Sequence, residues 1–475
     1  MNTQAFMSYT DAIKTLKDSP MFNLSLSSKE LFHSNFLYWI WKVDSNCFKG
    51  IIESLLGERN LNWGNDWVVS REYKNFDLCV KDRSNEDFEN DDSQNFGGDS
   101  SGSAEKPKKP KIYFVLENKV KSIPYKAQLD KYVDKVGEHH GKKMNVETKY
   151  LLLALPSGFP DEEAINKDPE KKWKIASYEH YLNAISNIKT TSDYARQIVA
   201  DYCRFVESLL FIYKEWQGKC YESDSHLLKG HNETYIKDAE DLRIHDLYHK
   251  SKYAQICAKI QSEIQSEIQH HIQGKVSIIE NDDKVIFSKL SNPQNQSSKF
   301  IAFGYGYTNG QPFVDVKVAL YDGKQPIICI IQAQGGWYRH GIIMDHSKLS
   351  EYDGTKDQRI WNYLEKNNVT PIGGNIICVN GHEWMRFENF ASGAVGKMNS
   401  LSNIKSVIND NERDIVDAYH LYPNCKSRKD SQPYGKYAGD NSNIGMIYQY
   451  RKLASSVTVG QLIDYIVKDV KRLIR

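Results

Sequence analysis

Long apolar runs are absent from this chain of 475 residues. The longest, near Phe36–Trp41 and Tyr150–Pro156, fall far short of the ~18 residues that a membrane span needs. Residues Met1–Asp18 lack the apolar segment of a secretory signal. We therefore expect a cytoplasmic protein without membrane spans.

An excess of either charge is also missing. Lys and Arg total 62 against 61 Asp and Glu, a net charge of +1. Net charge thus gives no indication of a nucleic-acid partner, although a local basic groove would be enough for one. The eight cysteines form no C-x-x-C pair, so we expect reduced thiols rather than a thiolate zinc site.

The composition, 40% hydrophobic and 26% charged, is typical of a folded globular protein. We expect two domains, residues 1–230 and 231–475, because the sequence pattern changes within 222–240. Residues 82–110 form an insert in the first domain. The first 24 of these hold eight acidic residues and only two bulky hydrophobic ones, which predicts a flexible acidic loop.

Apolar spacing predicts layered α/β structure in the first domain. The expected elements are a helix over 27–43, strands over 67–73, 76–80 and 112–120, a helix over 125–136, a strand over 149–155 and a helix over 192–216. The second domain reads as α+β. We expect a helix over 241–273, strands over 284–288, 313–321 and 327–332, and helices over 411–421 and 459–473.

Charged residues interrupt the apolar strand expected over 112–120, at Glu117-Asn118-Lys119. Because a strand has a period of two residues, Glu117 and Lys119 face the same side. Asp77 interrupts the strand expected over 76–80. If these strands are neighbours, Asp77 and Glu117 can share one hard cation such as Mg²⁺, which binds oxygen ligands and retains waters. Lys119 would then orient a water or stabilise charge on a phosphate.

A second acid-x-Lys sequence, Asp315-Val316-Lys317, lies on a strand expected in the second domain. No companion acid is evident on a neighbouring strand there. We therefore assign the chemistry to Glu117 and Lys119, and none to this second copy.

The ordered set of Asp77, Glu117 and Lys119 on two strands, followed by a helix, resembles the PD-(D/E)XK nuclease superfamily. Bacterial members carry Glu-Asn-Lys followed by Gln-Leu-x-x-Tyr, and this chain has Gln-Leu-Asp-Lys-Tyr at 128–132. The resemblance implies a restriction-endonuclease-like core, an α-β-β-β-α-β mixed sheet, over about residues 25–160. It also implies a catalytic site of Asp77, Glu117, Lys119 and Gln128.

Three residues take their roles from this resemblance, and each has an ordinary alternative. Gln128 would support the metal site, or be a solvated helix residue. Glu30 would be an outer metal ligand, or it would close an S-x-x-E capping box with Ser27. Glu72 would join the metal ligands, or be an exposed hairpin residue. For Glu117 and Lys119 the alternative is a surface ion pair on an edge strand.

The resemblance implies a Mg²⁺-dependent endonuclease, with Mn²⁺ as a substitute, that hydrolyses phosphodiester bonds. DNA is favoured over RNA as its substrate, and bacterial defence against viruses, or restriction, as its setting. The second domain would recognise targets, form homo-oligomers, bind a partner protein or act as a sensor. The alternative is a catalytically silent nuclease fold that binds nucleic acid as a sensor or assembly module.

Overall fold

The computed structural model describes residues 7–25, 29–63, 66–83, 110–140, 146–168, 172–188, 192–228, 233–271, 275–281, 283–308, 310–322, 325–345, 376–379, 382–386, 416–422, 435–436 and 444–475. The chain divides into two compact units. Unit 1 comprises Met1–Trp216 and Ile236–Ser251, and unit 2 comprises Gln217–Tyr235 and Lys252–Arg475. Most of the predicted insert, residues 84–109, lies outside the described residues.

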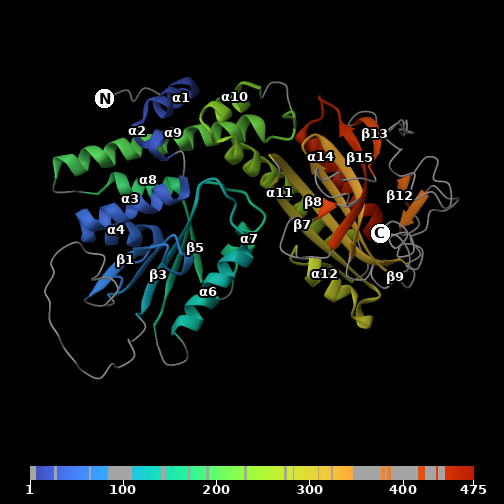
Figure 1. Cartoon of the computed structure of the whole chain (residues 1–475), viewed down its shortest axis with the longest axis horizontal. Coiled ribbons are helices and arrows are strands. Elements are labelled where there is room, and N and C mark those ends of the chain that lie inside the picture. Colours follow the sequence, from blue (N-terminus) through green and yellow to red (C-terminus); the bar gives the residue numbers. More distant parts are fainter. Residues whose placement is uncertain are drawn as a thin grey trace. The chain divides into compact units, whose positions relative to one another are not determined.

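Unit 1 is built on a five-stranded mixed sheet (Figure 1), which confirms the predicted α/β class. The strands lie in chain order from one edge to the other. β1 pairs antiparallel with β2, and β2 pairs antiparallel with β3. The pairs β3–β4 and β4–β5 are parallel. The strands are β1 (Trp67–Arg71), β2 (Leu78–Asp82), β3 (Ile112–Lys119), β4 (Lys149–Ala154) and β5 (Trp173–Ser177).

Helices lie on both faces of this sheet, so its central strand, β3, is buried along nearly its whole length. On one face, Asn118 contacts α3 (Lys29–Val43) and α8 (Tyr178–Ser186). On the other, Glu117 contacts α6 (Lys126–His140). The remaining helical elements of unit 1 are α1 (Tyr9–Asp18), α2 (Pro20–Ser25), α4 (Ser45–Leu56), η1 (Tyr73–Asn75) and α7 (Glu162–Asn166). Three further helices are divided between the two units: α9 (Asp193–Cys220), α10 (Glu233–Asp241) and α11 (His245–His271).

The helix α4 is missing from the predicted order, although its ends are marked in the sequence. Asp44 caps its start, since one carboxylate oxygen accepts the backbone N–H groups of Asn46 and Cys47. Gly57 ends it in the left-handed conformation, with φ of 69°. Its buried face, which includes Phe48 and Ile52, adds to the core on the α3 side of the sheet.

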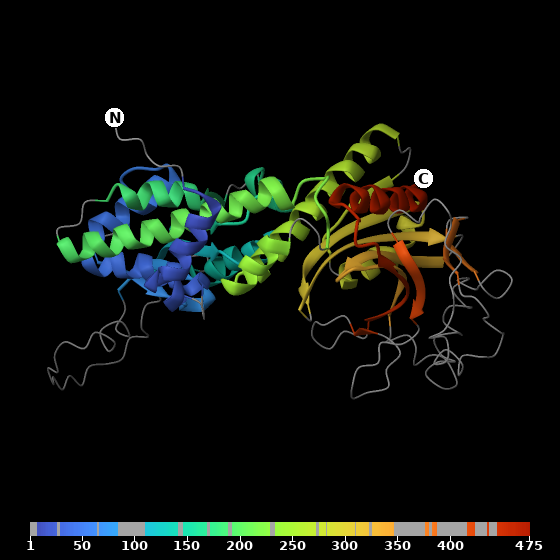
Figure 2. The same cartoon turned by 90° about the horizontal axis from the view of Figure 1, so that it is seen from above.

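Unit 2 contains an eight-stranded sheet that curves strongly (Figure 2). Its main path runs β13-β15-β10-β9-β8-β7-β6, with β14 paired to β15, and β11 and β12 form a separate pair. The elements are β6 (Lys275–Ile278), α12 (Asp283–Leu290), η2 (Pro293–Asn295), β7 (Ser298–Thr308), β8 (Gln311–Asp322), β9 (Gln325–Gln334), β10 (Trp337–Asp345), β11 (Ile376–Val379), β12 (His382–Arg386), β13 (Val416–Tyr422), β14 (Gly435–Lys436), β15 (Ile444–Leu453) and α14 (Val459–Ile474).

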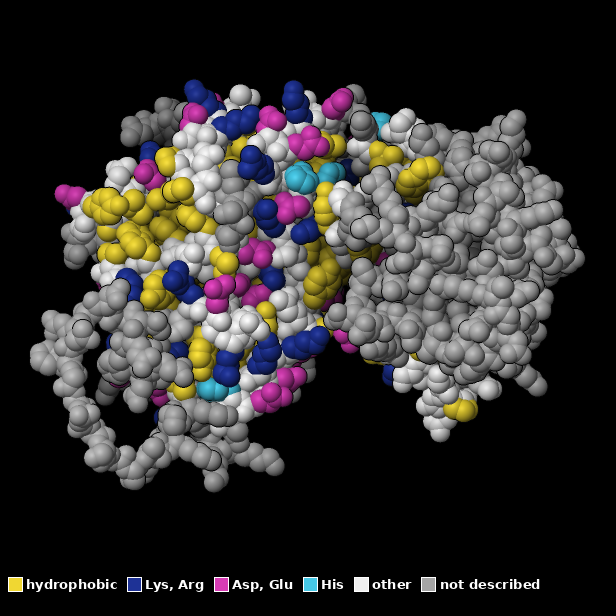
Figure 3. Space-filling model, in the orientation of Figure 1, with side chains coloured by type: hydrophobic (Ala, Val, Ile, Leu, Met, Phe, Trp, Pro, Cys, Tyr) yellow, Lys and Arg dark blue, Asp and Glu magenta, His cyan; other side chains and the backbone are white. Residues whose placement is uncertain are grey.

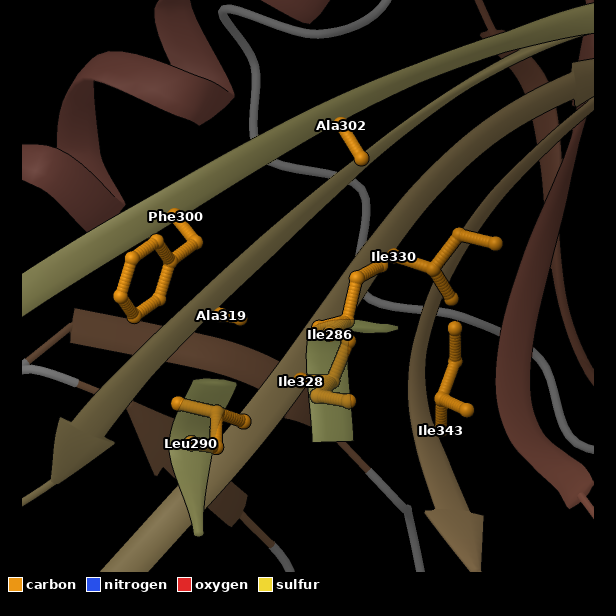
Figure 4. Packing of buried hydrophobic residues seen from close by; sticks show 8 residues of the cluster. All are labelled: Ile286, Leu290, Phe300, Ala302, Ala319, Ile328, Ile330 and Ile343. Carbon is orange, nitrogen blue, oxygen red and sulfur yellow. The ribbon is translucent and has the colours of Figure 1, made fainter. Parts of the chain in front are cut away.

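Two predictions in this unit are wrong. Residues 284–288 form part of the helix α12, not a strand, because a short apolar run fits either structure. Ile286 and Leu290, four residues apart, pack on Ile328 and Ile330 of the sheet (Figure 4). The second error is the helix expected over 411–421, since Val416–Tyr422 is the strand β13.

Within the described residues, no helix is both long enough and apolar enough to cross a membrane.

Candidate active site

The sheet register brings Asp77 to the end of β3. Leu78 of β2 pairs with Leu116 of β3, so Asp77 lies beside the next residue on that strand, Glu117. The Asp77 carboxylate accepts a hydrogen bond from the backbone N–H of Asn118, with N and Oδ2 2.7 Å apart. Strand pairing and this hydrogen bond thus hold Asp77 and Glu117 side by side, although the whole insert separates them in the sequence.

Glu117 and Lys119 form a buried ion pair, with Nζ and Oε1 2.6 Å apart. Only 3% of Glu117 and 7% of Lys119 is exposed. The Gln128 amide, from α6, donates to the same Glu117 oxygen at 3.1 Å and to the Tyr132 hydroxyl at 3.0 Å. Because β3 is central and both side chains are buried, the pair is not the surface ion pair of an edge strand.

Burial dominates the electrostatics of the two carboxylates. It raises the pKa of Asp77 to about 6, against the hydrogen bond from Asn118 and the charge of Lys119, which lower it. Burial and then the Asp77 charge raise the pKa of Glu117 to about 7. For Lys119, burial lowers the pKa, but Glu117, Glu30 and Asp77 together outweigh it and the net shift is upward. The site therefore brings two carboxylates together at a cost, and the Lys119 ammonium is paired with one of them, Glu117.

These residues fit a hard divalent cation. The second oxygen of Glu117, Oε2, is buried and has no hydrogen-bond partner among the described residues. Such an oxygen beside a second carboxylate is a good ligand for Mg²⁺, which retains waters and needs few protein ligands. A denser site is not found. Within the described ranges, no group of three or more His, Cys, Asp or Glu side chains is placed to hold a metal.

Glu30 lies at the site, but one of its oxygens is occupied. Oε1 accepts the backbone N–H groups of Val120 and Lys121 at 3.3 Å and that of Ser122 at 2.9 Å, together with the Ser122 hydroxyl. Glu30 thus fixes the turn that follows β3, and its charge also raises the pKa of Asp77 and of Glu117. The alternative capping box lies partly outside the described residues, since Ser27 is one of the residues not described.

Glu72 lies at the rim of the site. It is exposed, and it precedes η1 with a left-handed φ of 54°. Its charge contributes to the raised pKa of Asp77, although it is the smallest of the causes. Glu72 is therefore near the carboxylates without being buried among them.

Asn118 organises the site, a role that the sequence reasoning missed. Its amide donates to the backbone oxygen of Glu30 at 2.8 Å and accepts from the Tyr178 hydroxyl at 2.7 Å, while its backbone N–H binds Asp77. It is fully buried, and it joins β3 to α3 and α8. The available signal was the amide itself, because an Asn inside a buried strand requires partners.

Tyr132, the last residue of the Gln-Leu-x-x-Tyr sequence, is also part of the site. Its hydroxyl accepts from Gln128, and its pKa is raised by burial and by the Glu117 charge. Gln128 and Tyr132 thus lie on one face of α6, and Gln128 links Tyr132 to Glu117.

Residues 106–204 match the family model described as the PD-(D/E)XK nuclease superfamily. The resemblance to this superfamily is thereby confirmed over that stretch, which contains β3 and α6 and so includes Glu117, Lys119 and Gln128. Glu30, Glu72 and Asp77 precede it. Searches of curated proteins and of solved structures gave no match.

Proposed function

We propose that unit 1 is a divalent-cation-dependent endonuclease that hydrolyses phosphodiester bonds of DNA. The observation that carries the proposal is the convergence of Asp77, Glu117 and Lys119 in one buried cluster. The match to the nuclease superfamily over residues 106–204 supports the same reaction class.

In this proposal Asp77 and Glu117 hold Mg²⁺, for which Mn²⁺ can substitute. The bound cation would supply Lewis acidity to the phosphate and an activated water. Glu117 offers its unpartnered oxygen Oε2, while Gln128 orients the carboxylate from the other side through Oε1. Outer support comes from Glu30, which fixes the turn after β3, and from the charge of Glu72.

Lys119 acts as a fixed positive charge, because its raised pKa keeps the ammonium protonated at neutral pH. We assign it two tasks, orienting the attacking water and stabilising the negative charge that grows on the phosphate oxygens. It does not serve as a general base in this form, since it has no lone pair to accept a proton.

We further propose that the protein acts in the bacterial cytoplasm, in defence against viruses or in restriction. Unit 2 would recognise targets, form homo-oligomers or bind a partner protein. These assignments rest on the resemblance to the nuclease superfamily and not on a contact in the structure.

The direct test incubates the full chain with plasmid, single-stranded DNA and RNA, in Mg²⁺, Mn²⁺ or EDTA. Cation-dependent cleavage that disappears in both Glu117→Ala and Lys119→Ala is the expected result. Cleavage that survives Glu117→Ala would refute the site. Tight binding without any cleavage would instead support a silent nuclease fold that binds nucleic acid.

A further inference from the structure

A pocket of about 520 Å³ lies between α3 and β1, the edge strand of the unit 1 sheet. Its volume is within the range of ligand pockets. Among the residues lining it are Asn35, Tyr38, Trp41, Lys42, Arg71 and Glu72. On the face of unit 1 seen in Figure 3, hydrophobic side chains gather near the helices that Figure 1 labels α3 and α8, with Lys and Arg side chains beside them.

The wall of the pocket alternates aromatic rings and cations. The Arg71 guanidinium carbon lies 4.4 Å from the centroid of the Tyr38 ring, and Nη1 donates to the Asn35 amide oxygen at 2.8 Å. The Tyr38 and Trp41 rings are 5.4 Å apart, and the Lys42 ammonium lies 5.0 Å from the Trp41 ring centroid. Within the part of the chain that the structure describes, Arg71 forms no ion pair with a carboxylate.

This arrangement leaves the positive charge of Arg71 available at the pocket. An arginine held over a ring by an amide, rather than neutralised by an acid, can still pair with a phosphate. Tyr38 and Trp41 are only partly buried, so ring surface is exposed beside the charge. Rings with interleaved cations are what proteins use to hold unpaired nucleotides, because every base can stack on a ring.

The pocket lies at the same end of the sheet as the candidate active site, on the α3 side, whereas Glu117 faces α6. Arg71 pairs across the sheet with Leu78, the residue after Asp77, and Glu72 both lines the pocket and acts on Asp77 through its charge. Along α3, Trp41 lies eleven residues beyond Glu30, which is about 16 Å. That length corresponds to about five nucleotides of one strand at ~3.4 Å each.

We propose that this pocket binds a single-stranded segment of the nucleic acid a few nucleotides from the cleaved bond. Tyr38 and Trp41 stack an unpaired base, and Arg71 binds its phosphate. The inference rests on the proposed function and narrows its substrate class to DNA with an unpaired stretch, such as a flap, an overhang or a free strand. An intact duplex would gain nothing from the rings, since its bases are already stacked inside the helix.

The test measures binding of a fluorescein-labelled dT20 strand and of a 20-base-pair duplex to the full chain, in EDTA, by anisotropy. Trp41→Ala and Arg71→Ala should each weaken dT20 binding about tenfold and change duplex binding less. Trp41→Phe, which keeps a stacking surface, should restore most of the affinity. Tyr194→Ala is the matched control, because Tyr194 is 72% exposed on α9 and lies outside the pocket.

Photo-crosslinking locates the strand independently of affinity. A dT20 strand carrying one 5-iodouracil should crosslink to the tryptic peptide of residues 30–42, which contains both Tyr38 and Trp41. Unchanged dT20 affinity in Trp41→Ala and Arg71→Ala, with crosslinks only elsewhere, would overturn the inference and leave the pocket to a protein partner.

The outcome is separable from that of the proposed function. Glu117-dependent cleavage, together with dT20 binding that Trp41→Ala and Arg71→Ala do not affect, would refute only the proposed role of the pocket. Binding that depends on the pocket, in a protein that never cleaves, would refute only the proposed nuclease activity.

Discussion

Two strands of this protein carry the same acid-x-Lys pattern, and only one of them forms a candidate active site. Glu117 and Lys119 lie on β3, Asp315 and Lys317 on β8, and all four side chains are buried. What differs is the neighbouring strand. Beside Glu117 the structure places a second carboxylate, Asp77, whereas the residues directly opposite Asp315 are Gly304 and Gln332.

The middle residue of the two patterns differs as well. Val316 is apolar and buried, as in an ordinary sheet core, but Asn118 binds Glu30, Asp77 and Tyr178. An acid-x-Lys motif on a strand therefore forms a candidate active site only when neighbouring elements supply a second carboxylate and hydrogen-bond partners for the middle residue.

The largest expected effect comes from the same isosteric change at both motifs. Glu117→Gln removes a cation ligand and should lower the single-turnover rate of DNA cleavage at least about a hundredfold. Asp315→Asn should leave that rate within about twofold, because it touches no part of the proposed chemistry. Equal losses in the two variants would erase the contrast between the motifs.

The second effect concerns the middle residue. Asn118→Val makes the first motif resemble the second and leaves the Glu30 carbonyl and the Tyr178 hydroxyl without their partner. We expect a loss of about 2–3 kcal/mol in the free energy of unfolding, measured in urea. Tyr178→Phe removes only one of these hydrogen bonds and should cost about 1 kcal/mol. A stable Asn118→Val protein would show that the network contributes little.

Cation binding gives a third, slightly smaller difference. If free Mg²⁺ exceeds its dissociation constant a few tens of times, it should stabilise the wild type by about 2 kcal/mol in thermal unfolding. The gain should vanish in Asp77→Asn and Glu117→Gln and persist in Asp315→Asn. Stabilisation that survives the first two substitutions would place the cation elsewhere.

The smallest predicted effect comes from the histidine behind the site. Burial lowers the pKa of His33 to about 3, and its Nδ1 contacts the Tyr202 hydroxyl at 2.5 Å. Since the unfolded value is 6.5, the contribution of neutral His33 is present above pH 6.5 and is lost as the pH falls below it. The buried histidine of unit 2, His340, instead lies 2.6 Å from Asp469.

To isolate this contribution, the free energies of unfolding of wild type and His33→Gln are compared at pH 7.5 and pH 5.5. The advantage of the wild type should shrink by about 1 kcal/mol at the lower pH. The subtraction removes the Asp77 and Glu117 contributions, which change in the opposite direction because the pKa values of those groups are raised. A constant difference between the two proteins would mean that His33 is accessible to protons.

The elements nearest the site were predictable from sequence because their patterns are local. β3 begins with five apolar residues and β4 is apolar after its first residue, and α6 follows β3 with helical spacing. Glu117 and Lys119 were predictable as a pair from the strand period alone. The capping of α4 by Asp44 is an equally local signal, so this helix was also predictable from the sequence.

The remaining features depend on partners far apart in the chain. Glu30 binds amides some 90 residues later, and Tyr178 reaches Asn118 from 60 residues away. No spacing rule indicates such contacts, since they arise only after the helices pack on the sheet. The same holds for the α3–β1 pocket, whose walls come from a helix and a strand with α4 between them.

The most direct test of the account is the position of the cation. Crystals of the full chain soaked in Mn²⁺ should show an anomalous difference peak bounded by the carboxylates of Asp77 and Glu117, and the Glu117→Gln crystals should lack it. A peak elsewhere, or none at a Mn²⁺ concentration that supports DNA cleavage, would contradict the claim that these two strands build a metal-dependent hydrolytic centre.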